Sequence, residues 1–175
     1  GDGAVDTTDV TLLGAALSAG DLSMLTCSST GEENACEGTY EVPGDTTVEF
    51  LAACTSITGS LSITESTLTE LTLPLLTEVT GYFFVHDNAK LTSLALPALT
   101  SVGSDFKVLS NPELATLSLP EFTHAKNDFW VRSNTGLTTL DCPLLANIDG
   151  VMDLYGNEIL ETVAFPALTE VSGAM

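Results

Sequence analysis

Two aspartates, Asp105 and Asp128, stand 23 residues apart in a chain whose other motifs repeat at the same interval. Two carboxylates held close together can raise the pKa of one of them, and such pairs act as general acid and base in polysaccharide cleavage. Lys107 and Arg132 are expected close enough to offset these charges, so the sequence favours a solvated ion-pair network. A polysaccharide-active enzyme is therefore the most distant function that we consider.

The other residue types that carry chemistry form no second catalytic pattern. His86 and His124 have no Cys or His neighbours at the spacing of a metal site, and we expect them on different sides of the molecule. The sequence contains no glycine-rich phosphate loop and no G-x-S-x-G motif. We therefore predict that the protein is not an enzyme.

The N-terminal segment "DGAVDTTD" resembles the second half of an EF-hand-type calcium loop, as in dockerin-like repeats. That resemblance implies that Asp2, Asp6 and Asp9 are calcium ligands at the start of a helix. The first half of the loop is absent, and its last position holds Asp rather than Glu. The alternative, which we favour, is an acidic helix N-terminus capped by Asp6 or Asp9. Calcium is the only cofactor that the sequence suggests.

The elements that must position the remaining candidates repeat every 23 residues. Five copies of the phrase L-x-x-L-x-L-P, or close variants of it, occur without an insertion, and an asparagine keeps the same step. The prolines are Pro74, Pro97, Pro120, Pro143 and Pro166, and the asparagines are Asn88, Asn111, Asn134 and Asn157. A fixed period of this length is typical of a solenoid, whose coils bury their apolar faces by stacking on one another.

Each coil is predicted to contain about three short strands and no long helix. Phe83 and Val85 alternate with Phe84 and His86, as expected of a strand with one inward face. The equivalent inward pairs are also apolar: Phe106 and Val108, Phe129 and Val131, Met152 and Leu154. We expect the asparagine at the next corner to bond backbone groups that the turn leaves unpaired, in a ladder of stacked copies. The fold class is therefore all-β, a parallel β-solenoid.

The outward residues of this first strand form the candidate binding surface. Its residues are Tyr82, Phe84, His86, Lys107, Leu109, Trp130, Arg132 and Tyr155. Exposed aromatic side chains beside Lys and Arg suit the binding of a protein or a sugar, and Trp130 could stack on a sugar ring or anchor a partner's side chain. The alternative is that a loop, the N-terminal segment or a neighbouring subunit covers these aromatics.

The four cysteines need separate interpretations. Cys36 and Cys54 bracket a segment just before the first coil, and a disulfide between them would staple the N-terminal end of the solenoid. Cys27 could instead pair with Cys36, and the sequence leaves both pairings open. Either bridge implies an oxidising compartment. Cys142 replaces a leucine at an inward position, which predicts a buried, inert thiol.

The coils resemble the receptor L-domain family, a leucine-rich-repeat-like, right-handed β-solenoid. The resemblance rests on "CTSITGSLSI", from Cys54 to Ile63, and on the L-x-x-L-x-L-P-x-L-x-x-V phrases that follow, and it covers roughly residues 36–175. It implies a cap over residues 36–58, with Cys36 in the place of the family's cap disulfide partner. Residues 1–35 are expected to form a separate helical segment, because Val10, Leu13 and Leu17 fit the apolar stripe of a helix. The resemblance also implies an extracellular recognition or structural module without catalysis.

The charge balance narrows the classes of partner. A net charge of −20 with only four Lys and Arg residues argues against binding to nucleic acid or to an anionic membrane. No run of 18 apolar residues occurs, so we expect no membrane insertion. The chain begins at Gly1 without a visible signal peptide, and we expect that it was processed or excised.

The sequence thus predicts an extracellular or cell-surface module for binding or adhesion, with a protein or glycan partner at the outward strand face. The alternative is a structural subunit that assembles head to tail through open solenoid ends into a surface filament or layer.

Overall fold

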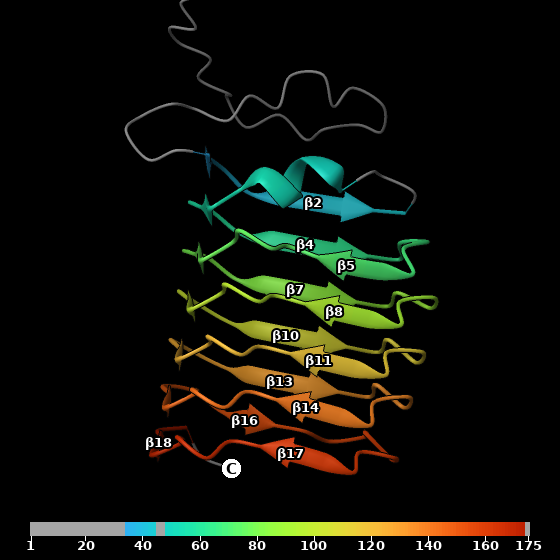
Figure 1. Cartoon of the computed structure of the whole chain (residues 1–175), viewed down its shortest axis with the longest axis vertical. Coiled ribbons are helices and arrows are strands. Elements are labelled where there is room, and N and C mark those ends of the chain that lie inside the picture. Colours follow the sequence, from blue (N-terminus) through green and yellow to red (C-terminus); the bar gives the residue numbers. More distant parts are fainter. Residues whose placement is uncertain (1–33, 45–47, 174–175) are drawn as a thin grey trace, which may run out of the picture.

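The computed structural model describes residues 34–44 and 48–173. They form a β-solenoid in which short parallel strands stack along the long axis of the molecule (Figure 1). Three parallel sheets, which we call sheets A, B and C, make the sides of the stack. Apart from one short 3-10 helix, η1 (Glu49–Ala53), the described elements are all strands. The predicted all-β parallel solenoid is therefore confirmed.

Each of the five coils from β3 to β17 contributes one strand to every sheet. Sheet A contains β1 (Ala35–Cys36), β3 (Ser56–Ile57), β6 (Glu78–Val79), β9 (Ser101–Val102), β12 (His124–Ala125), β15 (Asn147–Ile148) and β18 (Glu170–Val171). Sheet B contains β2 (Tyr40–Pro43), β4 (Leu61–Thr64), β7 (Phe83–His86), β10 (Phe106–Leu109), β13 (Phe129–Arg132) and β16 (Met152–Asp153). Sheet C contains β5 (Glu70–Thr72), β8 (Ser93–Ala95), β11 (Thr116–Ser118), β14 (Thr139–Asp141) and β17 (Thr162–Ala164).

The 23-residue period sets the register of all three sheets. Phe106 of β10 lies opposite Phe83 of β7 on one side and Phe129 of β13 on the other. The three rings stack, with centroids 5.2 and 5.1 Å apart, and none of them is exposed. Stacked identical side chains of this kind bury apolar area and add a favourable ring geometry. The core is thus a set of columns of like residues, as the repeat predicts.

The predicted asparagine ladder is confirmed at the corner that follows sheet B. Asn88, Asn111 and Asn134 are fully buried. The backbone N–H of Asn88 donates to Oδ1 of Asn111 at 3.1 Å, and that of Asn111 donates to Oδ1 of Asn134 at 3.0 Å. Ser66 occupies the first rung, where its backbone N–H and its hydroxyl both donate to Oδ1 of Asn88. The ladder satisfies buried backbone groups that the turn would otherwise leave unpaired.

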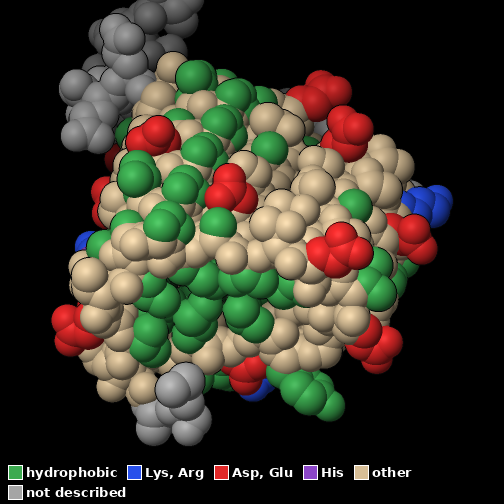
Figure 2. All heavy atoms as spheres, turned by 60° about the horizontal axis from the view of Figure 1, so that its bottom comes forward, with side chains coloured by type: hydrophobic (Ala, Val, Ile, Leu, Met, Phe, Trp, Pro, Cys, Tyr) green, Lys and Arg blue, Asp and Glu red, His purple; other side chains and the backbone are tan. Residues whose placement is uncertain are grey.

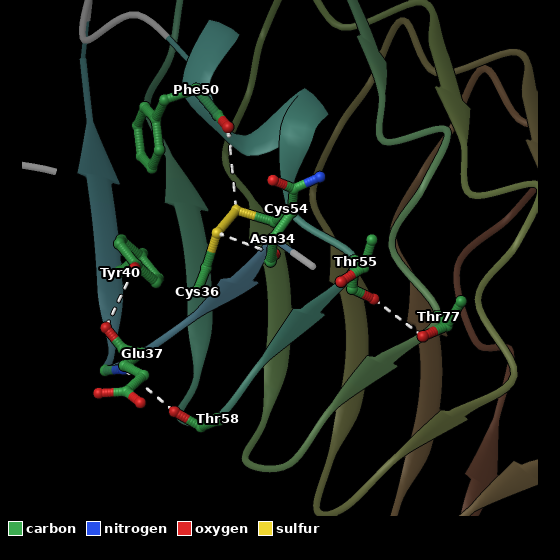
Figure 3. The surroundings of a disulfide bond; sticks show 10 residues. Asn34, Cys36, Glu37, Tyr40, Phe50, Cys54, Thr55, Thr58 and Thr77 are labelled. Atoms are coloured by element: carbon green, nitrogen blue, oxygen red, sulfur yellow. Dashed lines mark hydrogen bonds between the residues drawn. A yellow bond between two sulfur atoms is a disulfide. The ribbon is translucent and has the colours of Figure 1, made fainter. Parts of the chain in front are cut away.

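A cap closes the N-terminal end of the stack. In the first coil β1 lies in sheet A and β2 in sheet B, whereas η1 takes the place that a strand of sheet C holds elsewhere (Figure 1). Cys36 and Cys54 form a disulfide between β1 and the end of η1 (Figure 3). This confirms the pairing that the family resemblance implies. The 3-10 helix was not predicted, because the cap segment has no second copy whose pattern could be compared.

Candidate functional site

The register of sheet B brings the predicted binding residues onto one outer face. Phe84, Lys107, Trp130 and Asp153 follow one another in adjacent strands of one column. His86, Leu109 and Arg132 form the neighbouring column, two residues further along each strand. Tyr82 precedes β7, with its ring centroid 4.3 Å from that of Phe84, and Tyr155 follows β16. We call these nine residues the outer face of sheet B.

Trp130 lies at the centre of a cation–aromatic cluster. Nζ of Lys107, from the preceding coil, lies 3.9 Å from the Trp130 ring centroid, and Cζ of Arg132, from the same strand, lies 4.2 Å from it. The Lys107 ammonium is also 5.4 Å from the ring of Phe84. A cation within about 6 Å of an aromatic ring is attracted by the ring's quadrupole. The Trp130 ring is therefore already in contact with two cations of its own chain.

Asp105 and Asp128, the two residues that suggested acid–base chemistry, bind Lys107 and backbone groups of the neighbouring coil. Asp105 Oδ2 is 2.6 Å and Asp128 Oδ2 is 3.7 Å from Nζ of Lys107. Asp105 Oδ1 accepts hydrogen bonds from Nδ2 of Asn127 and from the backbone N–H of Asp128, and Asp128 Oδ1 accepts one from the backbone N–H of Val151. Both carboxylates thus join neighbouring coils. The ion-pair network that the sequence favoured is present for Lys107.

This arrangement is a second ladder between coils. The hydroxyl oxygen of Thr39 accepts the backbone N–H of Ser60, and the hydroxyl of Ser60 accepts that of Tyr82. Asp105 and Asp128, three and four coils after Thr39, also accept a backbone N–H from the next coil through their side chains. Sequence reasoning missed this ladder because its residue types change from coil to coil, whereas those of the asparagine ladder do not.

Arg132 forms an ion pair with Asp153 of the next coil rather than with Asp105 or Asp128. The hydrogen bond from Arg132 lowers the pKa of the Asp153 carboxyl and raises the pKa of the Arg132 guanidinium. Within the described part of the chain, Nε1 of Trp130 and Nε of Arg132 are buried donors without an acceptor. The face is therefore charged but largely neutralised, and it keeps two unused donors.

The aromatic residues of the outer face of sheet B differ in exposure. Tyr155 is 79 % exposed, whereas Tyr82, Phe84 and Trp130 are half-buried by their neighbours in the face. The side chain of Lys107 is only 13 % exposed, because Asp105, Phe84 and Trp130 surround it. The sequence predicted this set of aromatics as exposed, and only Tyr155 fully meets that expectation. The face is a packed layer rather than a set of free side chains.

The other two sides carry smaller or more polar residues. The outward residues of sheet C are short, including Thr72, Ala95 and Ser118, and two exposed leucines, Leu75 and Leu144, lie in the turns that follow this sheet. On sheet A, Nε2 of His124 lies 2.9 Å from Oδ1 of Asp149. His86 lies on sheet B, within 3.0 Å of Asp87 and 3.3 Å of Thr64. The two histidines are thus on different sides, as predicted.

No group of three or more His, Cys, Asp or Glu side chains is placed to hold a metal ion among residues 34–44 and 48–173. Asp2, Asp6 and Asp9, the calcium ligands suggested by the sequence, lie outside the described residues, as does Cys27.

In the described part of the chain, none of the helices has the length and apolar character needed to cross a membrane. Cys142 is buried and unpaired, and burial raises the pKa of its thiol.

Comparisons with curated proteins and with solved structures found no match. A family model, however, matches residues 53–150, which include the coils that carry most of the outer face of sheet B. The chain belongs to the receptor L domain family.

Proposed function

We propose that this chain is an extracellular protein-binding module whose contact surface is the outer face of sheet B. The family to which it belongs comprises receptor-type, non-enzymatic domains that bind protein ligands. The Cys36–Cys54 disulfide supports an oxidising, extracellular location. The observation that carries the proposal is the cluster of Trp130 with Lys107 and Arg132, because Trp, Tyr and Arg are the residue types that dominate binding energy at protein interfaces.

The packing of this cluster supports a protein partner over a glycan. A sugar that stacked on Trp130 would have to displace a cation that already lies about 4 Å from the ring. A protein partner can instead cover the packed layer as it stands, with little loss of side-chain freedom.

Tyr155 is the natural anchor of the interface. It is the most exposed of the large hydrophobic residues described, and it lies at the end of the column that contains Leu109 and Arg132. An exposed tyrosine beside a rigid layer offers a large contact area at a low entropic cost. Adhesion at a cell surface is the biological setting that we infer for such a module.

The test uses the disulfide-bonded chain on an array of secreted proteins and on a glycan array. Wild type is compared with Tyr155→Ala, Trp130→Ala and the control Thr139→Ala, which changes the outer face of sheet C. We expect wild type and Thr139→Ala to bind the same proteins, and the other two variants to lose at least about tenfold in affinity. Equal binding by all four proteins would disprove the contact surface. Binding to glycans alone would disprove the partner class.

Head-to-tail assembly into a filament or layer remains the alternative prediction. One observation weighs against it for the disulfide-bonded chain: the N-terminal end is covered by the cap, so that only the C-terminal end of the described stack is open.

A further inference from the structure

The cations of the outer face of sheet B are neutralised by carboxylates of the same chain. Nζ of Lys107 lies 2.6 Å from Oδ2 of Asp105 and 3.7 Å from Oδ2 of Asp128, and Arg132 pairs with Asp153. Three carboxylates thus surround two cations. An acidic partner that covers this face therefore finds no free cation to pair with there.

A column of exposed side chains borders this face along the corner where the strands of sheet B end. We call it the corner column, and it consists of the residues that directly follow β4, β7, β10 and β13: Glu65, Asp87, Ser110 and Ser133. Backbone hydrogen bonds keep the column in register, since the N–H of each residue donates to a carbonyl oxygen of the next coil. The corner column is thus fixed by the same stacking as the strands that it follows.

All four residues of the corner column adopt a backbone conformation that favours glycine. Their φ angles lie between 50° and 57°, and the last coil has Gly156 at this corner. This conformation is costly for a residue with a Cβ, and residues held in it are frequent at ligand-binding sites. Within the described residues, the side chains of Glu65, Ser110 and Ser133 make no hydrogen bond or ion pair. The chain therefore keeps side chains at a costly position where three of the four have no internal contact of this kind.

The corner column carries negative charge that the described chain leaves largely unpaired. Glu65 has no ion pair, and Asp87, whose side chain is 57 % exposed, pairs only with His86, at 3.0 Å. Because adjacent strands lie about 4.8 Å apart, the two carboxylates are neighbours. Lys90 and Glu113 hold equivalent positions of successive coils beyond this corner, and their opposite charges largely cancel. The corner thus offers two neighbouring carboxylates to the cations of a partner.

The molecule as a whole adds to this negative field. The chain has 24 Asp and Glu residues against four Lys and Arg, and its net charge is −20. Figure 2 shows the imbalance: Asp and Glu side chains are spread over this view of the surface, and Lys and Arg appear only near its margins. A field of one sign repels further copies of the chain and speeds the encounter with partners of the opposite sign. The charge therefore favours a basic partner over a second copy.

We propose that the protein bound by the outer face of sheet B is basic, and that its contact extends over the corner column. This inference rests on the proposed function, because it names the partner class of the same surface. Lys and Arg side chains of the partner pair with Glu65 and Asp87, and its polar groups bond the hydroxyls of Ser110 and Ser133. Such rim charges mainly set the rate of association, whereas the packed layer beside them mainly sets the rate of dissociation.

The test measures binding kinetics of the disulfide-bonded chain on the same array of secreted proteins, whose sequences give the net charge of each, at low and high concentrations of sodium chloride. We expect the bound proteins to carry a net positive charge, and their association rate constants to fall about tenfold or more between about 0.05 and 0.5 M salt. Bound proteins of neutral or negative charge, or association that does not change with salt, would overturn the proposal. An array on which wild type binds nothing contradicts this proposal and the proposed function alike.

Two pairs of substitutions separate the corner column from the overall charge. Glu65→Gln with Asp87→Asn removes the two carboxylates of the corner column. Glu70→Gln with Glu121→Gln removes two exposed carboxylates from sheet C and from the turn that follows β11, so that the net charge changes by the same amount. At about 0.15 M sodium chloride, the first pair should slow association about threefold more than the second. Equal rates would show that only the overall charge acts, and they would overturn the extension over the corner column.

Ser110→Gly with Ser133→Gly tests the use of the strained backbone. Because glycine relieves the strain, this variant should have a higher urea midpoint, and yet it should dissociate about twofold faster from the same array proteins. A more stable variant that dissociates at the wild-type rate would show that these side chains take no part in binding, which contradicts the proposal.

Trp130→Ala distinguishes the failure of this proposal from the failure of the proposed function. If it dissociates like wild type, the outer face of sheet B is not the contact surface, and both proposals fail. If it dissociates faster while association of wild type does not change with salt, the outer face of sheet B stands and only the basic partner is refuted.

Discussion

Replacement of Asn111 by alanine tests the asparagine ladder at its centre. Oδ1 of Asn111 accepts hydrogen bonds from the backbone N–H and from Nδ2 of Asn88, at 3.1 and 3.0 Å. The two hydrogens of its Nδ2 are shared among three acceptors at 3.0–3.1 Å, namely the carbonyl oxygens of Val85 and Leu109 and Oδ1 of Asn134. The side chain therefore joins three coils inside a region from which water is excluded.

The expected loss follows from the groups that the change leaves unpaired. At least the backbone N–H of Asn88 and one carbonyl oxygen lose a buried partner. Each unsatisfied buried group costs about 1–3 kcal/mol, so we expect Asn111→Ala to lower the free energy of unfolding by about 3–5 kcal/mol. The cavity left by the amide contributes in the same direction.

Urea denaturation followed by circular dichroism measures this loss, with Asn157→Ala as the matched control. Asn157 donates to the carbonyl oxygens of Val131 and Leu154 and accepts the backbone N–H of Asn134, but its side chain is only half-buried in the last described coil, where water can replace these bonds. We expect the control to lose less than half as much as Asn111→Ala. Equal losses in the two variants, or a loss below about 1 kcal/mol at Asn111, would refute the ladder as a stabilising element.

Three further predictions concern the core, a corner and the outer face. Phe106→Ala removes a ring stacked between two others and should cost about 3–5 kcal/mol in the same urea experiment, and a loss below that of an average surface variant would contradict the stacked core. Ser133 has a φ of 54° at a corner where the next coil has Gly156, so Ser133→Gly should stabilise by about 0.5–1 kcal/mol, measured as a higher urea midpoint. Because the folded-state pKa of Asp153 lies below its unfolded value of about 3.9, its contribution is present above that value and is lost as the pH falls through the folded pKa. Thermal melts should therefore show a smaller acid-induced loss of Tm for Asp153→Asn than for wild type, and identical losses would exclude this contribution.

The repeat explains why the stack could be predicted from the sequence. Once one coil is interpreted, the 23-residue step assigns Phe106 and Phe129 to the same column, and the hydrophobic effect makes that column the core. The buried thiol of Cys142 follows from the same register, because Leu119 of the preceding coil is buried at the equivalent position. Periodicity thus replaces the long-range information that a single sequence usually lacks.

The parts that do not repeat were predicted less well. The Cys36–Cys54 disulfide was predicted through the family resemblance, but η1 occurs once and has no second copy to reveal its position. On the outer face of sheet B, the register placed Lys107 beside Trp130 but not the ammonium over the ring. That contact depends on side-chain rotamers, which a pattern of residue types does not specify. The same holds for the choice of Asp153 as the partner of Arg132.

The central claim, that partners bind the outer face of sheet B, is tested most directly by hydroxyl-radical footprinting of the chain with a protein captured on the array. Tyr155 and Trp130 report on this face, and the exposed Leu75 and Leu144 report on the turns beside sheet C. We predict that binding lowers the oxidation of Tyr155 and Trp130 and leaves that of the two leucines unchanged. Protection of Leu75 and Leu144 with no change at Tyr155 and Trp130 would contradict the claim.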